Sequence, residues 1–195
     1  MVVSQQEQEV TLATIEACRQ GDRDAFRELY EAYKDKVYSM ALYFFHGDAA
    51  TAADVTQHVF LKLMGNIRQF RGESGFSTWL YRFVANACVD RTRTAGARAP
   101  MTDPAVLDDL PAAGSPEDDF ADAQIAISVQ SAVSTLAPKI RMAILLRYFE
   151  DLSYAEIAAV LKCSIGTVAS RLSRGHEILA QTLAPLREPS STREP

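Results

Sequence analysis

Hydrophobic residues recur every three or four positions along most of the chain, which is the period of a helix with one buried face. In the N-terminal half, three such stretches follow one another with glycine or acidic residues between them. Gly21 is expected to end the first helix, Asp22 or Asp24 to cap the second, and Asp48 to cap the third. No run with a period of two is long enough for a sheet, so the pattern predicts a helical bundle.

A loop with two glycines is expected over residues 70–75, ahead of a fourth helix. Ser77 is the expected N-cap of that helix, in which Trp79, Leu80 and Phe83 share one apolar stripe.

Two further helices are expected at the start of the C-terminal half. An apolar stripe runs from Ile125 to Leu136, and Pro138 is well placed in the first turn of the next helix, because proline lacks an N–H that this position does not use. The predicted fold class is therefore all-α in both halves.

The pattern of a helix-turn-helix follows. Ser153 and Glu156 form a capping box for a short helix, a tight turn spans residues 162–165, and a second helix spans 166–179. Lys162 stands where many such motifs have glycine, so either the turn differs or the lysine adopts a left-handed backbone conformation.

Residues 94–122 are expected to form a flexible acidic linker. They hold four of the eight prolines and seven acidic residues against one arginine, a composition that favours an irregular chain. The predicted units are an N-terminal segment with the first helix over 1–20, a helical domain over 21–93, the linker over 94–122, a helix-turn-helix domain over 123–184, and a disordered tail over 185–195.

The net charge of −5 argues against a protein that holds DNA tightly by itself, because contacts with phosphate require basic side chains. The charge is unevenly distributed, however, and residues 62–93 carry six basic residues against two acidic ones. This basic segment is a candidate surface for nucleic acid.

Five aromatic residues interleave with arginines in the same segment. Aromatic faces stack on unpaired bases while arginines hold the backbone beside them. The alternative is that the aromatic residues belong to the core, which is the interpretation favoured for Trp79 and Phe83. For Phe70, Arg71 and Asn86 the sequence favours a role in binding.

The second helix of the helix-turn-helix has an apolar face formed by Val168 and Leu172. Short hydroxyls and basic groups face the other way, and such groups reach phosphates and guanine edges in a major groove. A solvated αα-hairpin is the alternative interpretation. The outward residues are Thr167, Ser170, Arg171, Ser173, Arg174 and His176.

Nothing in the sequence indicates secretion, a membrane span, a metal site or catalysis. The N-terminus has no apolar run, and no stretch reaches the roughly 18 apolar residues of a membrane span. The three cysteines and three histidines have no spacing typical of metal ligands and no evident catalytic partner. We expect a cytoplasmic protein with reduced, packed thiols that is not an enzyme and uses no cofactor or metal.

Three segments together resemble the extracytoplasmic-function (ECF) sigma factors, which are subunits that direct bacterial RNA polymerase to particular promoters. Residues 54–64 resemble the polymerase-binding helix of that family, residues 70–93 its promoter-melting and −10 reading segment, and residues 136–183 its −35 reading domain. The resemblance covers nearly everything outside the linker and the tails, and it implies two helical domains named region 2 and region 4.

The resemblance also implies roles for individual residues. The surface that docks on the coiled coil of the polymerase β′ subunit is matched by Asp54, Gln57, Phe60, Leu61 and Met64. The family positions that capture a flipped −10 base are occupied here by Phe70, Arg71, Ser74 and Asn86. The positions that contact the nearby duplex are occupied by Arg82, Asp90, Arg91 and Arg93. The −35 reading helix is matched by Ser170, Arg171 and Arg174.

The implied partners are core RNA polymerase, through its β′ coiled coil and β flap, promoter DNA, and an anti-sigma factor that is often membrane-anchored in this family. A stand-alone helix-turn-helix regulator is the main alternative, and it would leave the basic aromatic segment without a role. A decoy that mimics a sigma factor would lose the DNA-facing arginines. A 29-residue linker permits two readers to span one promoter without fixing their separation, so a scaffold such as polymerase is expected to set it.

Overall fold

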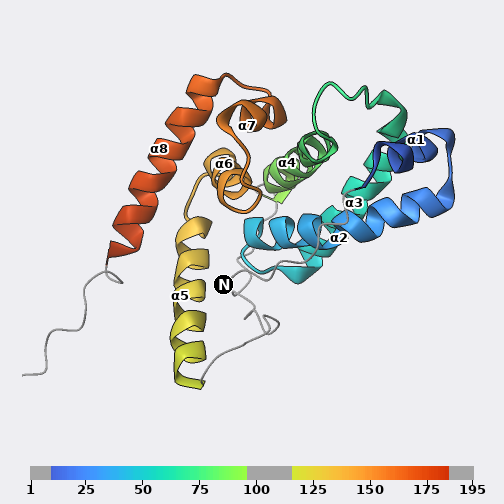
Figure 1. Cartoon of the computed structure of the whole chain (residues 1–195). Helices are drawn as coiled ribbons and strands as arrows, with labels where there is room; N and C mark the ends of the chain where they lie inside the picture. Colours follow the sequence, from blue (N-terminus) through green and yellow to red (C-terminus); the bar gives the residue numbers. More distant parts are fainter. Residues whose placement is uncertain (1–9, 96–115, 185–195) are drawn as a thin grey trace, which may run out of the picture.

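Every element in residues 10–95 and 116–184, the part of the chain that the structure describes, is a helix (Figure 1). The computed structural model confirms the all-α fold class over these residues. None of the helices described there has the length and apolar character needed to cross a membrane. The elements are α1 (Leu12–Gln20), α2 (Arg23–Phe44), α3 (Ala49–Asn66), a 3-10 turn η1 (Ile67–Gln69), α4 (Phe76–Ala95), α5 (Pro116–Ser134), α6 (Pro138–Tyr148), α7 (Tyr154–Leu161) and α8 (Ile165–Thr182).

The end of the first helix and the starts of the second and third lie where the sequence predicts them. Gly21 follows α1 with φ 92°, a left-handed conformation that glycine adopts without strain. The Asp22 carboxylate accepts hydrogen bonds from the N–H groups of Asp24 and Ala25, so Asp22 and not Asp24 is the N-cap of α2. Asp48 caps α3 in the same way, by accepting from the N–H of Thr51.

The start of α4 differs from the prediction. The helix begins at Phe76, and the N–H of Trp79 donates to the carbonyl of Gly75 at 3.1 Å, so Ser77 lies inside the first turn and is not the N-cap. Phe76 is buried in the core, and this packing extends the helix past the residue with the better intrinsic cap preference. The loop over residues 70–75 is confirmed.

The linker is also shorter than predicted, because α5 begins at Pro116. Proline is tolerated in the first turn of a helix, because its missing N–H is not needed there. A proline that indicated an irregular chain therefore also suits a helix start. The remaining part of the predicted linker, residues 96–115, and the predicted tail, residues 185–195, lie outside the described residues.

In the C-terminal half, Pro138 occupies the first turn of α6 and the capping box of Ser153 and Glu156 opens α7, both as predicted. Lys162 ends α7 with φ 48° and ψ 52°. The left-handed lysine is therefore the correct one of the two alternatives for the turn.

The two helical domains that the sequence predicts pack against each other in this structure. α4 contacts α6 and α7, α2 contacts α6, and their buried side chains belong to one continuous hydrophobic core. Figure 1 shows α6 and α7 next to α4 near the centre of the molecule. The physical reason lies in α6, where residues 141–146 are all buried, so both halves are needed to cover this helix.

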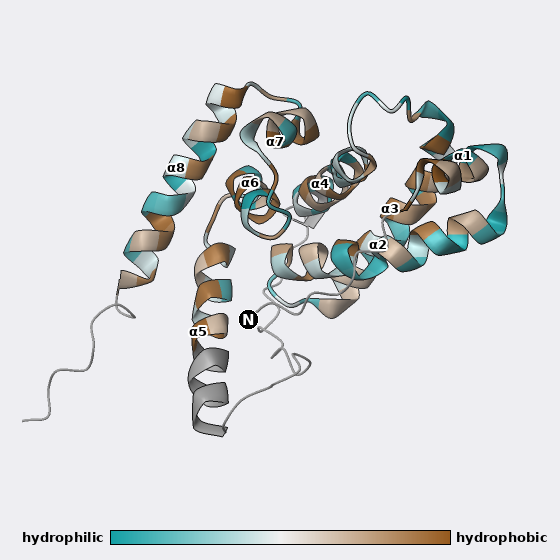
Figure 2. Cartoon of the chain, viewed as in Figure 1, coloured by the Kyte–Doolittle hydropathy of each residue, from teal (hydrophilic) through white to brown (hydrophobic). Residues whose placement is uncertain are grey.

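Gly175 allows α8 to lie directly against α6. Gly175 is buried on the same face of α8 as Val168 and Leu172. Figure 2 shows hydrophobic residues alternating with hydrophilic ones along α8, as expected for a helix with one buried face. A Cβ atom on Gly175 would lie 2.9 Å from two side-chain carbons of Ile144. The glycine thus fixes how closely the second helix of the helix-turn-helix approaches the core.

Arg141 is the charged residue within the contact between the halves. Its side chain is only 6 % exposed, and it donates to the carbonyl of Phe44, at the end of α2, at 2.7 Å. The same guanidinium lies 3.1 Å from Nε2 of His46. Burial, and then the positive charge of Arg141, lower the pKa of His46 to about 4.

Replacing Gly175 with leucine is expected to destabilise the protein by about 1–3 kcal/mol, although leucine is the better helix former, because the new side chain overlaps Ile144. The free energy of unfolding in urea measures this. Gly65→Ala in α3 is the control, since nothing lies within 4 Å of its added Cβ and stability should rise by up to about 1 kcal/mol. Equal effects of the two substitutions would contradict the close approach of α6 and α8.

Acidification is expected to weaken the contact between the halves through His46. The folded state keeps His46 neutral down to about pH 4, whereas the unfolded chain binds this proton below about pH 6.5. The unfolded state therefore binds more protons between these values, so stability present at pH 7 is lost as the pH falls through this window, by on the order of 1–2 kcal/mol at pH 5.

Urea unfolding of wild type and His46→Asn at pH 7 and pH 5 tests this expectation. Asparagine suits the left-handed backbone of His46, which has φ 61°, and does not titrate. Wild type should lose more stability than the variant between the two pH values, and equal losses would show that His46 does not titrate as described.

Candidate functional site

The α7–α8 unit holds its second helix in place with caps at both sides of the turn. Lys162 closes α7, and the Ser164 hydroxyl accepts from the N–H of Thr167 at 3.1 Å, which makes Ser164 the N-cap of α8. Ser164 lies in the predicted turn, and its role as a cap is an addition to that prediction, although a serine just before an apolar helical stripe is a typical N-cap signal. α8 is thereby a rigid helix of 18 residues with one exposed face.

Ser170, Ser173 and Arg174 are exposed on that face. The Ser170 hydroxyl donates to the carbonyl of Thr167 at 3.0 Å, and the Ser173 hydroxyl lies 3.5 Å from a Glu177 carboxylate oxygen. Among the described residues, no salt bridge includes Arg174. Its guanidinium is therefore available to an external phosphate or base edge.

The other three outward residues are partly engaged within the protein. Thr167 and Arg171 are half-buried, and the Arg171 guanidinium lies 3.6 Å from the Cys163 sulfur. His176 is exposed, and its Nε2 lies 2.7 Å from the hydroxyl of Tyr148 on α6. These contacts orient the side chains at the two edges of the α8 face.

Phe70 is a core residue in this structure, contrary to its interpretation as an exposed stacking group. It is 6 % exposed, and its ring lies 5.4 Å from the rings of both Phe76 and Trp79. Trp79 and Phe83 continue the aromatic cluster at 4.8 Å and are half-buried, which confirms their core interpretation. The core captures Phe70 because the loop folds back from η1 onto the start of α4.

Polar residues of the same loop remain at the surface. Arg71 and Ser74 are exposed in the loop, and Asn86 is exposed on α4, whereas Arg82 is half-buried. The aromatic cluster lies beneath the loop that carries Arg71 and Ser74, so the core supports this surface from below.

The structure joins two sets of residues that the sequence analysis kept apart. Arg91 on α4 forms an ion pair with Asp54 on α3, with 3.4 Å between Nη2 and Oδ2. Arg93 pairs with Asp90 one turn earlier on α4. Asp54 therefore belongs both to the expected polymerase-binding surface and to the charged edge of the basic segment.

A surface groove of about 920 Å³ lies between α2 and α3 and contains all five residues expected to bind polymerase. Leu61 and Met64 are 62 % and 55 % exposed, whereas Phe60 is buried and packs against Tyr30 with 4.8 Å between ring centroids. Asp54 and Gln57 are exposed along α3. Exposed apolar side chains gathered in one groove favour contact with an apolar partner surface.

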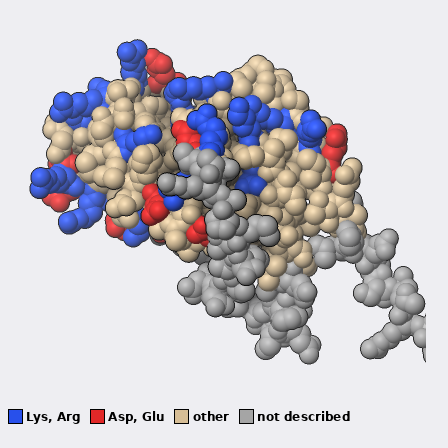
Figure 3. All heavy atoms as spheres, turned by 180° about the vertical axis from the view of Figure 1, so that it is seen from behind, with Lys and Arg blue, Asp and Glu red and all other residues tan. Residues whose placement is uncertain are grey.

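The α2 side of this groove was missed by the sequence analysis. Arg23, Arg27, Tyr30 and Lys34 line it at helical spacing, and the first three are exposed. Their recurrence at three- and four-residue intervals was a visible signal of one polar face. Basic side chains are prominent on the face of the molecule drawn in Figure 3.

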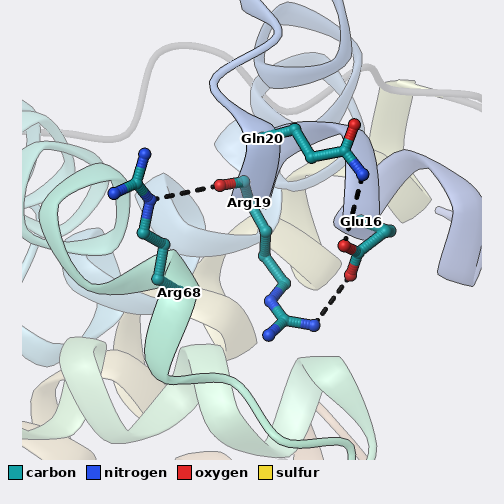
Figure 4. Close-up of polar contacts among 4 residues, drawn as sticks. All are labelled: Glu16, Arg19, Gln20 and Arg68. Carbon is teal, nitrogen blue, oxygen red and sulfur yellow. Dashed lines mark hydrogen bonds and ion pairs between the residues drawn. The ribbon is translucent and has the colours of Figure 1, made fainter.

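One basic residue of the 62–93 segment has a structural role. Arg68 Nε donates to the Arg19 carbonyl at 3.2 Å and so ties η1 to the last turn of α1, as Figure 4 shows. Arg19 in turn pairs with Glu16 at 2.7 Å. A cation at the C-terminal end of a helix is favourable for the helix dipole, so Arg68 contributes to the fold.

The three cysteines are free thiols, with Cys18 and Cys88 buried and Cys163 half-buried. Burial raises the pKa of the Cys88 thiol to about 12, which makes it unreactive. Among the described residues, no three His, Cys, Asp or Glu side chains are grouped to hold a metal ion.

Known proteins match both halves of the chain. Residues 29–98 match the family model for sigma-70 region 2, and residues 126–178 match the model for sigma-70 region 4. The RNA polymerase sigma-H factor of Pseudomonas aeruginosa is 34 % identical over 194 residues, covering 95 % of this chain and 98 % of that protein. The ECF sigma factor SigW of Bacillus subtilis is 33 % identical over 184 residues, covering 88 % of this chain and 96 % of its own length.

Solved structures share the fold. The sigma factor RpoE of Bartonella quintana, in complex with the anti-sigma factor NepR, matches with a TM-score of 0.66 at 22 % identity and covers 82 % of this chain and 96 % of its own. CnrH, in complex with the cytosolic domain of CnrY, matches with a TM-score of 0.64 at 21 % identity, over 89 % and 96 % of the two chains. With both family regions present in order and full-length relatives above 30 % identity, the chain belongs to the ECF sigma factors of RNA polymerase.

Proposed function

We propose that this protein binds core RNA polymerase and directs it to promoters, acting by binding and not by catalysis. In this proposal the α2–α3 groove docks on the β′ coiled coil, the loop 70–75 with α4 reads the −10 element, and α8 reads the −35 element. Region 2 then corresponds to residues 21–93 and region 4 to residues 123–184, with the first turns of α5 preceding the second unit. The proposal includes the β flap as the contact of region 4.

The observation that carries the proposal is the exposed apolar groove of region 2 on the same chain as the exposed polar face of α8. A stand-alone helix-turn-helix regulator needs the second surface only, and it would expose Leu61 and Met64 without a use. Exposed leucine and methionine in a groove are typical of a protein-binding surface. The groove therefore favours a scaffold-bound reader over the stand-alone regulator.

The rim of the groove supports a helical partner with acidic side chains. Arg23 and Arg27 lie one turn apart on α2, opposite Leu61 and Met64 on α3. An apolar seam flanked by charges is the pattern with which coiled coils contact other helices. Steering by the basic rim would raise the association rate, and the apolar centre would hold the complex.

Some of the residues expected to read the −10 element are exposed at the surface, and one supports the loop from the core. Arg71, Ser74 and Asn86 are exposed and are the proposed contacts with a flipped base, whereas Phe70 supports the loop from the core. Arg82, Asp90, Arg91 and Arg93 are the proposed contacts with the adjacent duplex, although ion pairs hold Arg91 and Arg93 in the free protein. DNA would then compete with Asp54 and Asp90 for these guanidinium groups.

Control by an anti-sigma factor is part of the proposal. Two proteins with the same fold, RpoE and CnrH, are seen with NepR and with the cytosolic domain of CnrY. A protein whose binding surfaces are exposed in the free state needs a partner that covers them when it is to be inactive.

Leu61→Glu or Met64→Glu is expected to weaken binding to core polymerase at least about tenfold, since each places an unpaired carboxylate in an apolar contact. Co-elution with core polymerase and a quantitative binding titration measure the loss. Leu12→Glu, at an exposed leucine of α1 outside the groove, is the matched control and should bind as wild type does. Undiminished binding by both groove variants with unchanged thermal stability would refute the assigned surface.

Arg174→Ala is expected to reduce transcription from promoters that carry a −35 element, because an arginine at a guanine edge contributes about 1–3 kcal/mol to discrimination. In vitro transcription with core polymerase on a library of −35 sequences measures the loss and shows whether one position becomes relaxed. Lys139→Ala, at an exposed basic residue of α6, is the control. Wild-type selectivity in Arg174→Ala would exclude this residue from the reading surface.

The same assay separates the two functions. A sigma factor gives promoter-specific transcripts only with polymerase and little specific binding alone, whereas tight, salt-resistant binding of promoter DNA by the isolated protein would favour the stand-alone regulator.

A further inference from the structure

The exposed face of α8 has two edges, and a different neighbour holds the side chain at each of them. At 3.6 residues per turn, Arg171 and His176 lie about 70° to either side of the buried face of the helix. Arg171 contacts the sulfur of Cys163 in the turn, and His176 contacts the hydroxyl of Tyr148 at the end of α6. Because one helix fills a major groove about 12 Å wide, its two edges face the phosphates of the two strands.

Tyr148 and His176 contact each other in two ways between α6 and α8. Nε2 of His176 lies 2.7 Å from the phenol oxygen, and the two rings are arranged edge to face with 5.7 Å between their centroids. Tyr148 is 60 % exposed, whereas the two helices already meet closely at the buried Gly175. The packing of α6 against α8 therefore does not depend on this tyrosine, and its contact with the histidine calls for another explanation.

This hydrogen bond determines which nitrogen of a neutral His176 ring carries the proton. A phenol O–H is a good donor, and an unprotonated imidazole nitrogen is a better acceptor than a phenol oxygen. Tyr148 therefore donates to Nε2, and the proton of the ring lies on Nδ1. Nδ1 has no hydrogen-bond partner among the described residues, and the side chain is exposed, so this N–H is available to an acceptor outside the protein.

The acceptor that suits this N–H is a DNA phosphate. A phosphate oxygen accepts hydrogen bonds and donates none, so it is bound by the Nδ1–H form of the ring and repels the lone pair of the other form. The N-terminal residues of a recognition helix are the ones that contact base edges. His176 lies six residues, or about 9 Å, beyond Ser170 along α8, so it is placed to meet the backbone at the edge of the groove.

We propose that Tyr148 is a positioning residue for −35 binding: its hydroxyl holds His176 in the Nδ1–H form, and His176 donates that hydrogen to a phosphate of the −35 duplex. The inference rests on the proposed function, because it adds a residue of α6 to the surface of α8 that is proposed to bind the −35 element. Tyr148 acts through the histidine and itself makes no contact with DNA. His176 fixes the position of the helix on the duplex and reads no base.

Long-range ¹H–¹⁵N NMR spectra of the free protein test the position of the proton without any activity. The chain has three histidines, and the spectrum of His176→Asn identifies the signals of His176. At pH 8, above the ordinary range of histidine titration, the wild-type ring should be in the Nδ1–H form. Tyr148→Phe keeps the aromatic ring and removes the hydroxyl, so this preference should be lost. A wild-type ring with its proton on Nε2 would overturn the proposal.

The affinity of the polymerase complex for promoter fragments measures the contact itself. Tyr148→Phe should lower this affinity at least about fivefold, and by the same factor on every −35 sequence of a library, since a phosphate contact carries no base identity. Thr182→Val is the matched control on α8, because it removes a hydroxyl that donates to the Ile178 carbonyl of the same helix at 2.9 Å. The control should bind as wild type does, and wild-type affinity in Tyr148→Phe would refute the proposal.

Double variants show whether Tyr148 acts through His176. In a His176→Ala background, Tyr148→Phe should cause no further loss of affinity. In His176→Asn the amide nitrogen lies near the place of Nδ1 and always carries hydrogens, so affinity should be partly restored and should no longer depend on Tyr148. A full additional loss in either background would mean that the tyrosine acts by itself, against the proposal. If the wild type forms no promoter-specific complex with polymerase, the proposed function fails, whatever the NMR spectra show.

Discussion

One buried guanidinium determines how the two halves of this protein meet. Arg141 is enclosed by the carbonyls that α2 and α5 cannot satisfy themselves, and burial lowers its pKa to about 10, which leaves it charged at neutral pH. A charge in such a place is favourable only with all its acceptors present. The end of α2, the end of α5 and the start of α6 are therefore arranged around a single side chain.

The contacts around Arg141 also affect the positions of α8 and α4, the helices proposed to bind DNA. Residues 141–146 of α6 are buried, and α6 contacts α8 closely at Gly175, so α6 links the placement of Arg141 to that of α8. On the other side α4 carries Asn86 outward and Tyr81 inward, toward region 4. The polar faces proposed to bind DNA are thus the outer sides of helices whose inner sides hold the two regions together.

Local signals in the sequence predicted the helices well and the contacts between them poorly. Caps such as Asp22, Asp48 and the Ser153–Glu156 box depend on residues within one turn, and the structure bears them out. The start of α4 and the burial of Phe70 depend on packing between distant segments, which no local pattern contains. The helix start at Pro116 was ambiguous, because proline and acids suit both a linker and a first turn.

The candidate site shows the same division. All five residues expected on the polymerase-binding surface line one groove, because they share one helix and its spacing is fixed. The α2 side of that groove could not be assigned, since which face of α2 meets α3 is a tertiary question. The pair of Arg91 and Asp54 was likewise hidden, as it joins α4 to α3 across 37 positions in the chain.

The net charge of the protein bears on how two binding surfaces on one chain can act together. In the proposed function, a protein with a net charge of −5 gains little from phosphate contacts alone, so selectivity comes from two sites engaged together. In the free protein, region 4 packs on region 2, while the polar face of α8 and the groove remain at the surface. In the proposed function, polymerase binds the groove of region 2, and docking on this scaffold sets the distance between the two readers.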